Sequence, residues 1–244
     1  MELWSEDIKW RSNLEIDADS FNRWSSSVLS PITDGVVPLS LDQTYANGKP
    51  IGKEFRFALV KFPKECRRSG LFSLEEKTVK NRLSTIYGSQ LGTCWFTDEV
   101  VFPHLSCAPR VAVMSLTPFE LFTCRPGIRR AKGNVFMAGL GLGFMAHRIL
   151  QKKTVTRLTI VEKDFDVIRV FGSRLENLYN CKRLDIIHAD FYEYAKGKGK
   201  LKNYDSIIMD IWMKFGDARR DQKAKELTKD YPCVWMWGNP KNNG

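Results

Sequence analysis

The second half of the chain alternates between short apolar runs and stretches with helical spacing. Nearly continuous apolar runs are typical of strands buried on both faces of a parallel sheet. These runs predict strands at 134–140, 157–162, 184–189, 204–211 and 233–237. Between them, apolar residues at one-face spacing predict helices at 143–153 and from Asp164 to about 178, with Ile168, Phe171, Leu175 and Leu178 inward. The charged segment 217–230 is also expected to be helical. The order βαβα predicts a Rossmann-like, doubly wound α/β domain with a mostly parallel sheet over residues 131–244.

The first half, residues 1–130, predicts a smaller α+β region with short antiparallel strands. The predicted strands are 54–62, 93–96, 100–102 and 111–114. A helix is expected from the capping box at Ser73 to Gly88, and another from Thr117-Pro118. Residues 1–30 have three tryptophans but no clean amphipathic spacing, so we expect an arm there. Residues 31–52 are rich in proline and glycine and are expected to form a loop. Residues 125–133 are expected to form a basic connector between the two halves.

Composition narrows the class of protein. No apolar run approaches the roughly 20 residues that span a bilayer. The acidic, mixed start does not resemble a secretory signal. Six cysteines without a C-x-x-C pair, and three histidines, argue against structural zinc or another metal site and favour reduced thiols. We therefore expect a cytoplasmic protein without a membrane partner; a homo-oligomer is possible.

The net charge of +10 is unevenly placed. Basic segments at 125–132 and 196–202 could bind an anionic partner such as nucleic acid. The alternative is a solvated surface that improves solubility. The sequence does not decide between them.

Three alternating glycines, Gly139, Gly141 and Gly143, connect the first predicted parallel strand to its helix. Such a turn lets a ligand approach the main chain at the positive end of a helix. The spacing is G-x-G-x-G rather than the dinucleotide fingerprint G-x-G-x-x-G, so it leaves less room for a pyrophosphate. No P-loop motif is present.

An acidic residue follows each of the next three predicted strands: Glu162, Asp190 and Asp210. A carboxylate after the second strand can accept hydrogen bonds from both ribose hydroxyls. A carboxylate after the third could accept from the adenine amine, with Phe191 against the ring. Alternatively, Glu162 is a surface residue before a helix, and Asp190 and Asp210 are caps or turn residues.

The runs VFMAGLGLG, TIVEKD, IIHADF and YDSIIMDIW resemble the class I S-adenosylmethionine-dependent methyltransferases, and most of all their spermidine-synthase-like branch. The resemblance covers residues 110–215 and implies S-adenosyl-L-methionine as cofactor. It implies that the cofactor contacts are Gly139, Leu140, Gly141, Gly143, Glu162, Lys163, Asp190, Phe191 and Asp210. It also implies that Asp210 faces the sulfonium and the acceptor; we take it as the catalytic base or the group that orients the acceptor. Trp212 could bind the substrate as a pocket wall, or simply pack under the loop.

Several departures limit the resemblance. The segment 210–217 lacks the D-P pair and the acidic residues of aminopropyltransferases, and the N/D-P-P-Y/F motif of base-amino methyltransferases is absent. The family's usual last two strands are missing, so the sheet is short or the N-terminal half fills that edge. We expect a methyltransferase whose acceptor, a small molecule or a nucleic acid, is unknown. The alternatives are an aminopropyltransferase that uses decarboxylated cofactor, and a non-catalytic nucleotide-fold protein that binds nucleic acid.

Overall fold

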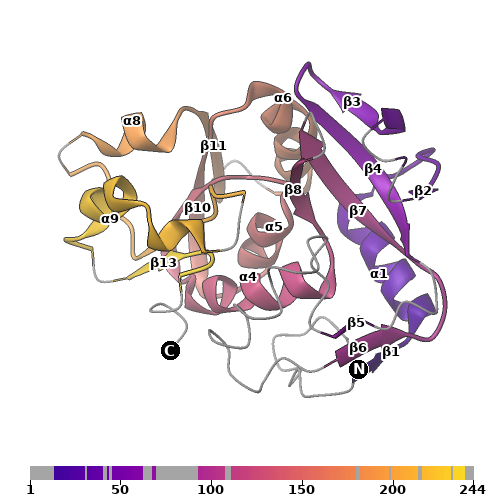
Figure 1. Ribbon diagram of the computed structural model, residues 1–244. Coiled ribbons are helices and arrows are strands. Elements are labelled where there is room, and N and C mark those ends of the chain that lie inside the picture. Colours follow the sequence, from indigo (N-terminus) through magenta and orange to yellow (C-terminus); the bar gives the residue numbers. More distant parts are fainter. Residues whose placement is uncertain are drawn as a thin grey trace. The chain divides into compact units, whose positions relative to one another are not determined.

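The computed structural model shows two compact units, Met1–Phe122 and Thr123–Gly244 (Figure 1). It describes residues 14–30, 32–40, 43, 46–62, 68–69, 93–107, 111–179, 182–197, 199–213, 216–231 and 233–239. The division falls inside helix α4 (Pro118–Arg130), eight residues before the expected boundary at 130/131.

Helix α4 corrects the prediction of a basic connector at 125–133. The helix begins at Pro118, as predicted, and continues through Pro126 to Arg130. A proline inside a helix removes one hydrogen bond. Burial offsets that loss, because Cys124 and Ile128 are at most 2% exposed and Gly127 lies directly against the ring of Trp235.

The C-terminal unit contains the predicted parallel sheet. Its strand order is β11 (Leu184–His188), β10 (Val155–Glu162), β9 (Gly133–Ala138), β12 (Ser206–Met209) and β13 (Val234–Met236). Every neighbouring pair is parallel. The fold class is therefore confirmed, and within the described residues this sheet has five strands.

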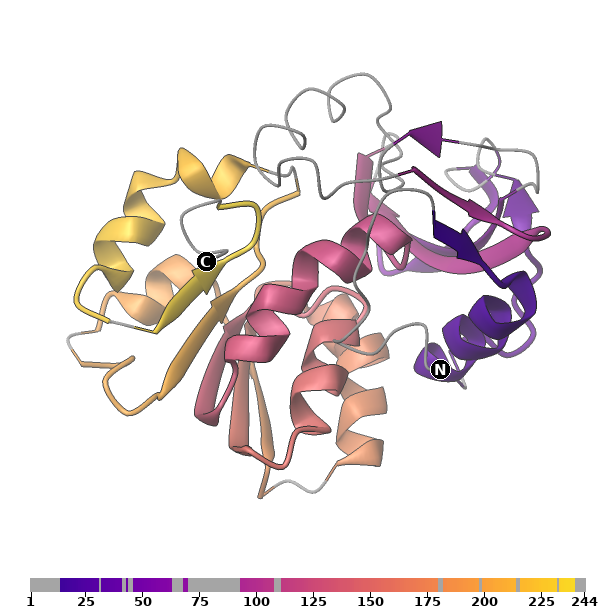
Figure 2. The same ribbon diagram turned by 90° about the horizontal axis from the view of Figure 1, so that it is seen from below.

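Helices cover both faces of this sheet (Figure 2). Helices α8 (Phe191–Ala195) and α9 (Gln222–Thr228) cover one face, where Phe136, Ile207 and Met209 form a buried apolar core with them. Helix α5 (Phe144–Leu150) and the helical segment from α6 (Phe165–Val167) to α7 (Ser173–Leu178) cover the other face. Burial of both faces explains why the strands read as continuous apolar runs.

The predicted helix after Asp164 contains a π-helical turn, Ile168–Gly172. The extra residue in that turn changes the phase of the buried face. Val167, Phe171 and Leu175 are buried, whereas Leu178, predicted to face inward, is 52% exposed.

The N-terminal unit has the predicted α+β character. Its larger sheet has the order β2 (Leu39–Ser40), β4 (Phe55–Phe62), β7 (Val100–Cys107) and β8 (Val111–Ser115), with β3 (Lys49–Ile51) also paired to β4. A second sheet has the order β1 (Leu14–Ile16), β6 (Thr93–Phe96) and β5 (Arg68–Ser69). The loop predicted over 31–52 is thus wrong where β2 and β3 form.

Helix α1 (Ala18–Leu29) also corrects the prediction of an irregular arm. The Asp17 carboxylate accepts a hydrogen bond from the backbone N–H of Ser20 at 2.8 Å. Phe21, Val28 and Leu29 form the buried face of the helix. The helix predicted from Ser73 to Gly88 lies outside the described residues. No helix in the described segments is both long and apolar enough to cross a membrane.

Candidate functional site

The register of the parallel sheet brings the predicted ligand residues to one edge. Past the ends of the strands, the N–H of Gly139 donates to the carbonyl of Val161 at 2.9 Å, and the N–H of Asp210 donates to the carbonyl of Ala138 at 2.8 Å. The N–H of Ala189 donates to the backbone carbonyl of Glu162 at 3.0 Å. We call the segments that follow these strands the carboxyl edge; they are residues 139–143, 162–166, 189–193, 210–213 and 216–221. Ligands of open α/β sheets bind at this edge.

The glycine turn is required by the backbone itself. Gly139 has φ +90°, and a Cβ on it would lie 2.0 Å from the main-chain oxygen of Asp210. Gly141 and Gly143 also have positive φ, and Gly143 precedes the first residue of α5. The close packing of β9 against the end of β12 therefore explains why residue 139 is a glycine, without any contribution from a ligand.

Glu162 points into the protein. It is 9% exposed, and its carboxylate accepts hydrogen bonds from the N–H of Leu140 at 2.8 Å and of Asp164 at 2.9 Å. These bonds rule out the alternative of a surface residue and join the glycine turn to the end of β10. An ionised carboxylate has about four acceptor positions, so about two remain for other donors.

Asp210 is half-buried at the same edge. Burial, and secondarily the charge of Glu162, raise the pKa of Asp210 to about 7. Within the described residues, neither Glu162 nor Asp210 forms an ion pair. The thiol of Cys124, in α4, lies within 4.8 Å of the Asp210 carboxylate. The carboxyl edge therefore holds two interacting carboxyl groups that have no ion-pair partner among the described side chains.

Asp190 caps helix α8. One carboxylate oxygen accepts from the N–H groups of Tyr192 at 2.8 Å and Glu193 at 3.2 Å, so the alternative of a helix cap is confirmed. The residue is exposed, and its second oxygen remains available. Phe191, predicted to lie on the adenine ring, is 4% exposed and packs in the core, 6.2 Å from the ring of Phe136. Capping by Asp190 turns the next side chain onto the sheet, which is the physical reason for that difference.

A different aromatic residue is exposed at the carboxyl edge. Phe165 is 59% exposed, and its ring lies 5.6 Å from the ring of His188. His188 in turn hydrogen-bonds the carbonyl of Lys163 at 3.0 Å, while the Lys163 side chain is exposed. Sequence reasoning missed Phe165; the available signal was an aromatic residue three positions after the acid at the end of a strand.

Trp212 is held by a hydrogen-bond network rather than by packing alone. Its indole N–H donates to the Asp221 carboxylate at 2.9 Å, and the Tyr192 hydroxyl donates to the same oxygen. The other oxygen of Asp221 caps α9 by accepting from Ala224 at 2.8 Å. Burial would raise the pKa of Asp221, but bonds from Tyr192, Ala224 and Trp212 and the charge of Lys223 lower it overall. Asp221 therefore fixes the segment after β12 to helices α8 and α9.

The chain matches no family model and no curated protein. Among solved structures it is similar to a spermidine synthase in complex with the transition-state analogue AdoDATO, with 19% identity over 46% of this chain and 44% of that one and a TM-score of 0.32. It is also similar to the 23S rRNA methyltransferase ErmE, with 14% identity over 47% of this chain and 44% of that one and a TM-score of 0.32. The match to spermidine synthase from Thermotoga maritima has 17% identity, covers 46% and 43%, and has a TM-score of 0.29. The chain thus matches less than half the length of each of these proteins. Similarity at this level does not assign the residues of the site, so their assignment depends on the contacts described above.

Proposed function

We propose that the C-terminal unit is an S-adenosylmethionine-dependent methyltransferase. The observation that supports this most is the pair of carboxyl groups, Glu162 and Asp210, on the two strands that flank the glycine turn. A buried acid whose pKa is raised by a second acid is stabilised in its ionised form by a nearby cation. A sulfonium meets that requirement, whereas the pyrophosphate of a dinucleotide would add negative charge.

Each residue of the carboxyl edge has a role in this proposal. The unused acceptor positions of Glu162 bind the ribose hydroxyls, and the second carboxylate oxygen of Asp190 accepts from the adenine amine. The exposed ring of Phe165 replaces Phe191 as the apolar surface for the base. The main chain of the Gly139–Gly143 turn contacts the methionine part.

When bound, the cofactor supplies an electrophilic methyl group. The protein has to align the acceptor and remove a proton where the nucleophile carries one. Asp210 is suited to the second task because its pKa, about 7, matches neutral conditions. Trp212, fixed by Asp221, forms one wall of the acceptor site. We also propose a cytoplasmic location, in keeping with Cys107 and Cys233, which form no disulfide.

Isothermal titration calorimetry tests the ligand class. We expect S-adenosylmethionine and S-adenosylhomocysteine to bind, and NAD⁺ not to bind. Glu162→Gln should weaken both by at least about tenfold, because removing a charged acceptor costs about 1.5–3 kcal/mol. Asp185→Asn, the same type of change at the other end of the sheet, is the matched control. A folded protein that binds neither sulfur compound, or prefers NAD⁺, contradicts the proposal.

The rival activity is aminopropyl transfer, since an acidic edge also attracts an ammonium group. Decarboxylated S-adenosylmethionine distinguishes the two. A methyltransferase should bind it more weakly than S-adenosylmethionine and transfer labelled methyl groups to an acceptor in a fractionated extract. Tighter binding of the decarboxylated compound, with transfer to putrescine, would establish the rival instead.

A further inference from the structure

The segments that lead into the parallel strands are strongly basic. Among the described residues these segments hold eleven Lys and Arg residues and two acidic ones. They are residues 129–133, 151–154, 179, 182–183, 196–197, 199–205, 229–231 and 233, and we call them the amino edge. The carboxyl edge, by contrast, holds three basic and eight acidic residues. Two amino-edge lysines, Lys196 and Lys229, pair with Glu193 and Glu226, so the excess of positive charge at this edge comes from its other cations.

Hydrogen bonds tie four of these segments into a row. The Ser206 hydroxyl, at the start of β12, bonds the carbonyls of Arg130 and Lys132 at 3.3 and 3.1 Å. The Asn134 side chain donates to the carbonyl of Asn203 at 2.8 Å. These contacts join the two basic segments, 125–132 and 196–202, at the same end of the sheet.

The row continues on the other side of β9. The Lys152 ammonium donates to the carbonyls of Ile128 and Arg129 at 2.6 and 2.8 Å. The Arg183 guanidinium donates to Leu150 and Val155 at 2.9 and 3.0 Å. Four adjacent strands at about 4.8 Å spacing make this row about 15 Å wide.

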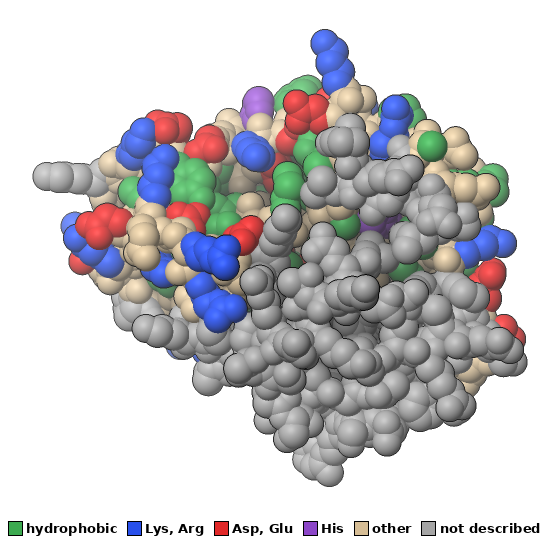
Figure 3. Space-filling view, in the orientation of Figure 1, with side chains coloured by type: hydrophobic (Ala, Val, Ile, Leu, Met, Phe, Trp, Pro, Cys, Tyr) green, Lys and Arg blue, Asp and Glu red, His purple; other side chains and the backbone are tan. Residues whose placement is uncertain are grey.

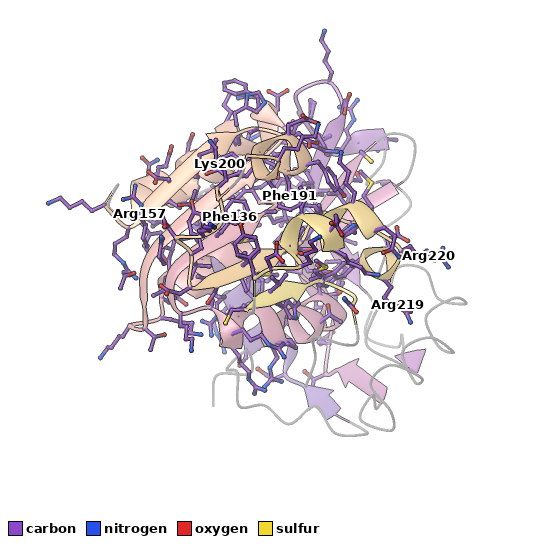
Figure 4. All side chains as sticks on the ribbon, turned by 90° about the vertical axis from the view of Figure 1, so that its left-hand side faces the viewer. Phe136, Arg157, Phe191, Lys200, Arg219 and Arg220 are labelled. Atoms are coloured by element: carbon purple, nitrogen blue, oxygen red, sulfur yellow. The ribbon has the colours of Figure 1, made fainter. Side chains whose placement is uncertain are left out.

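Several cations of the row are available to a ligand. Lys132, Lys153, Lys200 and Lys202 are exposed and, among the residues that the structure describes, form no ion pair. Lys200 lies 4.9 Å above the ring of Tyr194. Figure 4 shows Arg157 and Lys200 on one side of Phe136 and Phe191, and Arg219 and Arg220 on the opposite side. The two sets of cations therefore serve different surfaces.

We propose that the amino edge binds the phosphate backbone of nucleic acid, away from the cofactor edge and without base specificity. The exposed lysines of the row act as point charges toward phosphates, and phosphate contacts carry no information about base sequence. A lipid surface would also require an apolar face. The described residues of this edge include no large, exposed apolar side chain; Leu178, which is 52% exposed, lies just before the segment that starts at Tyr179. This proposal does not depend on the proposed methyl transfer.

Fluorescence anisotropy with a labelled 20-nucleotide RNA of mixed sequence tests the proposal on the full chain. The test variant is K132E/K153E/K202E at the amino edge. The control is R219E/R220E/K223E, which makes the same change in charge at exposed positions on the other side. At 50 mM salt we expect the test variant to bind at least tenfold more weakly and the control to stay within threefold of the wild type. The slope of log Kd against log salt concentration should be smaller by about two in the test variant than in the wild type, since each lost phosphate contact removes about 0.7 from this slope.

Three results would overturn the proposal: no binding by the wild-type protein at 50 mM salt, equal loss in both variants, or anionic lipid vesicles that bind as tightly as the RNA and show the same loss. Thermal unfolding and S-adenosylmethionine binding of the test variant should remain unchanged, which separates this proposal from the cofactor proposal. If the test variant unfolds, the single variants K153E and K202E are compared with R220E in the same way.

Discussion

The two ends of the parallel sheet differ in what they can bind, although the same strands form both. At the carboxyl edge, Glu162 is nearly buried and the pKa of Asp210 is raised by burial and by Glu162. At the amino edge most charges are on Lys and Arg side chains, among them the exposed lysines Lys132, Lys153, Lys200 and Lys202, and acids are few. Lys and Arg side chains (blue) are also prominent on the described surface that faces the viewer in Figure 3. The comparison shows that net charge alone does not indicate the charge of a particular site: this basic protein has an acidic, partly buried edge, at which we propose that a cationic cofactor binds.

Alanine substitution at Gly139, in the carboxyl edge, and at Gly133, in the amino edge, should give the largest difference in stability. At Gly139, alanine combines φ +90° with a contact of 2.0 Å to main-chain oxygen, so we expect a loss of about 4 kcal/mol or more, or no folded protein. At Gly133, φ is +64° and the new Cβ meets the Asp205 side chain, whose carboxylate accepts from the N–H of Asn134 at 2.7 Å, so about 2 kcal/mol is expected. Urea unfolding measures both; equal losses would contradict the argument.

Asp210→Asn should change how stability depends on pH. The folded protein holds a proton on Asp210 up to about pH 7 that the unfolded chain releases near pH 3.8. The stability due to this group is therefore fully present below about pH 4 and is lost as the pH rises to 7, by up to about 1.4 kcal/mol per pH unit. The variant should lack this loss and be more stable than the wild type at pH 8, by at most about 4 kcal/mol.

The measured quantity is the difference between wild type and variant across pH 4–8. Burial lowers the pKa values of His104 and His147 to about 4, and these groups change stability in the opposite direction between pH 4 and 6.5. Taking the difference removes their contribution. Asp185→Asn serves as the control, and a flat difference for Asp210→Asn would show that its carboxyl group ionises normally.

Much of this site follows from the sequence, because it depends on strand order. Continuous apolar runs predicted five parallel strands, and the register of such a sheet brings Gly139, Glu162, Asp190 and Asp210 to one edge. Side-chain direction could not be predicted in the same way. Phe191 turned into the core because Asp190 caps a helix, and Leu178 is exposed because it is the last residue of α7. Helix α1 was missed because serines and asparagine interrupt its apolar face.

Asp221→Ala should have an intermediate effect at the carboxyl edge. It removes the cap of α9 and the acceptor shared by Tyr192 and Trp212, so we expect about 2 kcal/mol of destabilisation. The pKa of Tyr192, raised first by burial and then by Asp221, should fall. Spectrophotometric titration of the tyrosines checks this, with Tyr192→Phe to assign the signal; an unchanged titration would mean that burial alone raises the pKa.

Asp185→Asn should have the smallest effect. The carboxylate pairs with Arg157, whose Nε lies 3.1 Å away, and both side chains are at least 40% exposed. Exposed pairs contribute about 0.5 kcal/mol or less and are screened by salt. Urea unfolding at 50 mM and 500 mM salt should show a small loss that disappears at the higher salt concentration. A loss above about 1 kcal/mol would indicate that the amino edge is less solvated than described.

The most direct test of the cofactor site compares S-adenosylmethionine with S-adenosylhomocysteine, which differ in the positive charge on sulfur. Kd values for both should be measured by calorimetry from pH 5.5 to 8.5. If Asp210 faces the sulfonium, the preference for S-adenosylmethionine rises with pH, by up to about tenfold per unit, as the carboxyl group ionises. In Asp210→Asn the preference should stay constant. A wild-type preference that does not change with pH, or a folded protein that binds neither compound, would contradict the account.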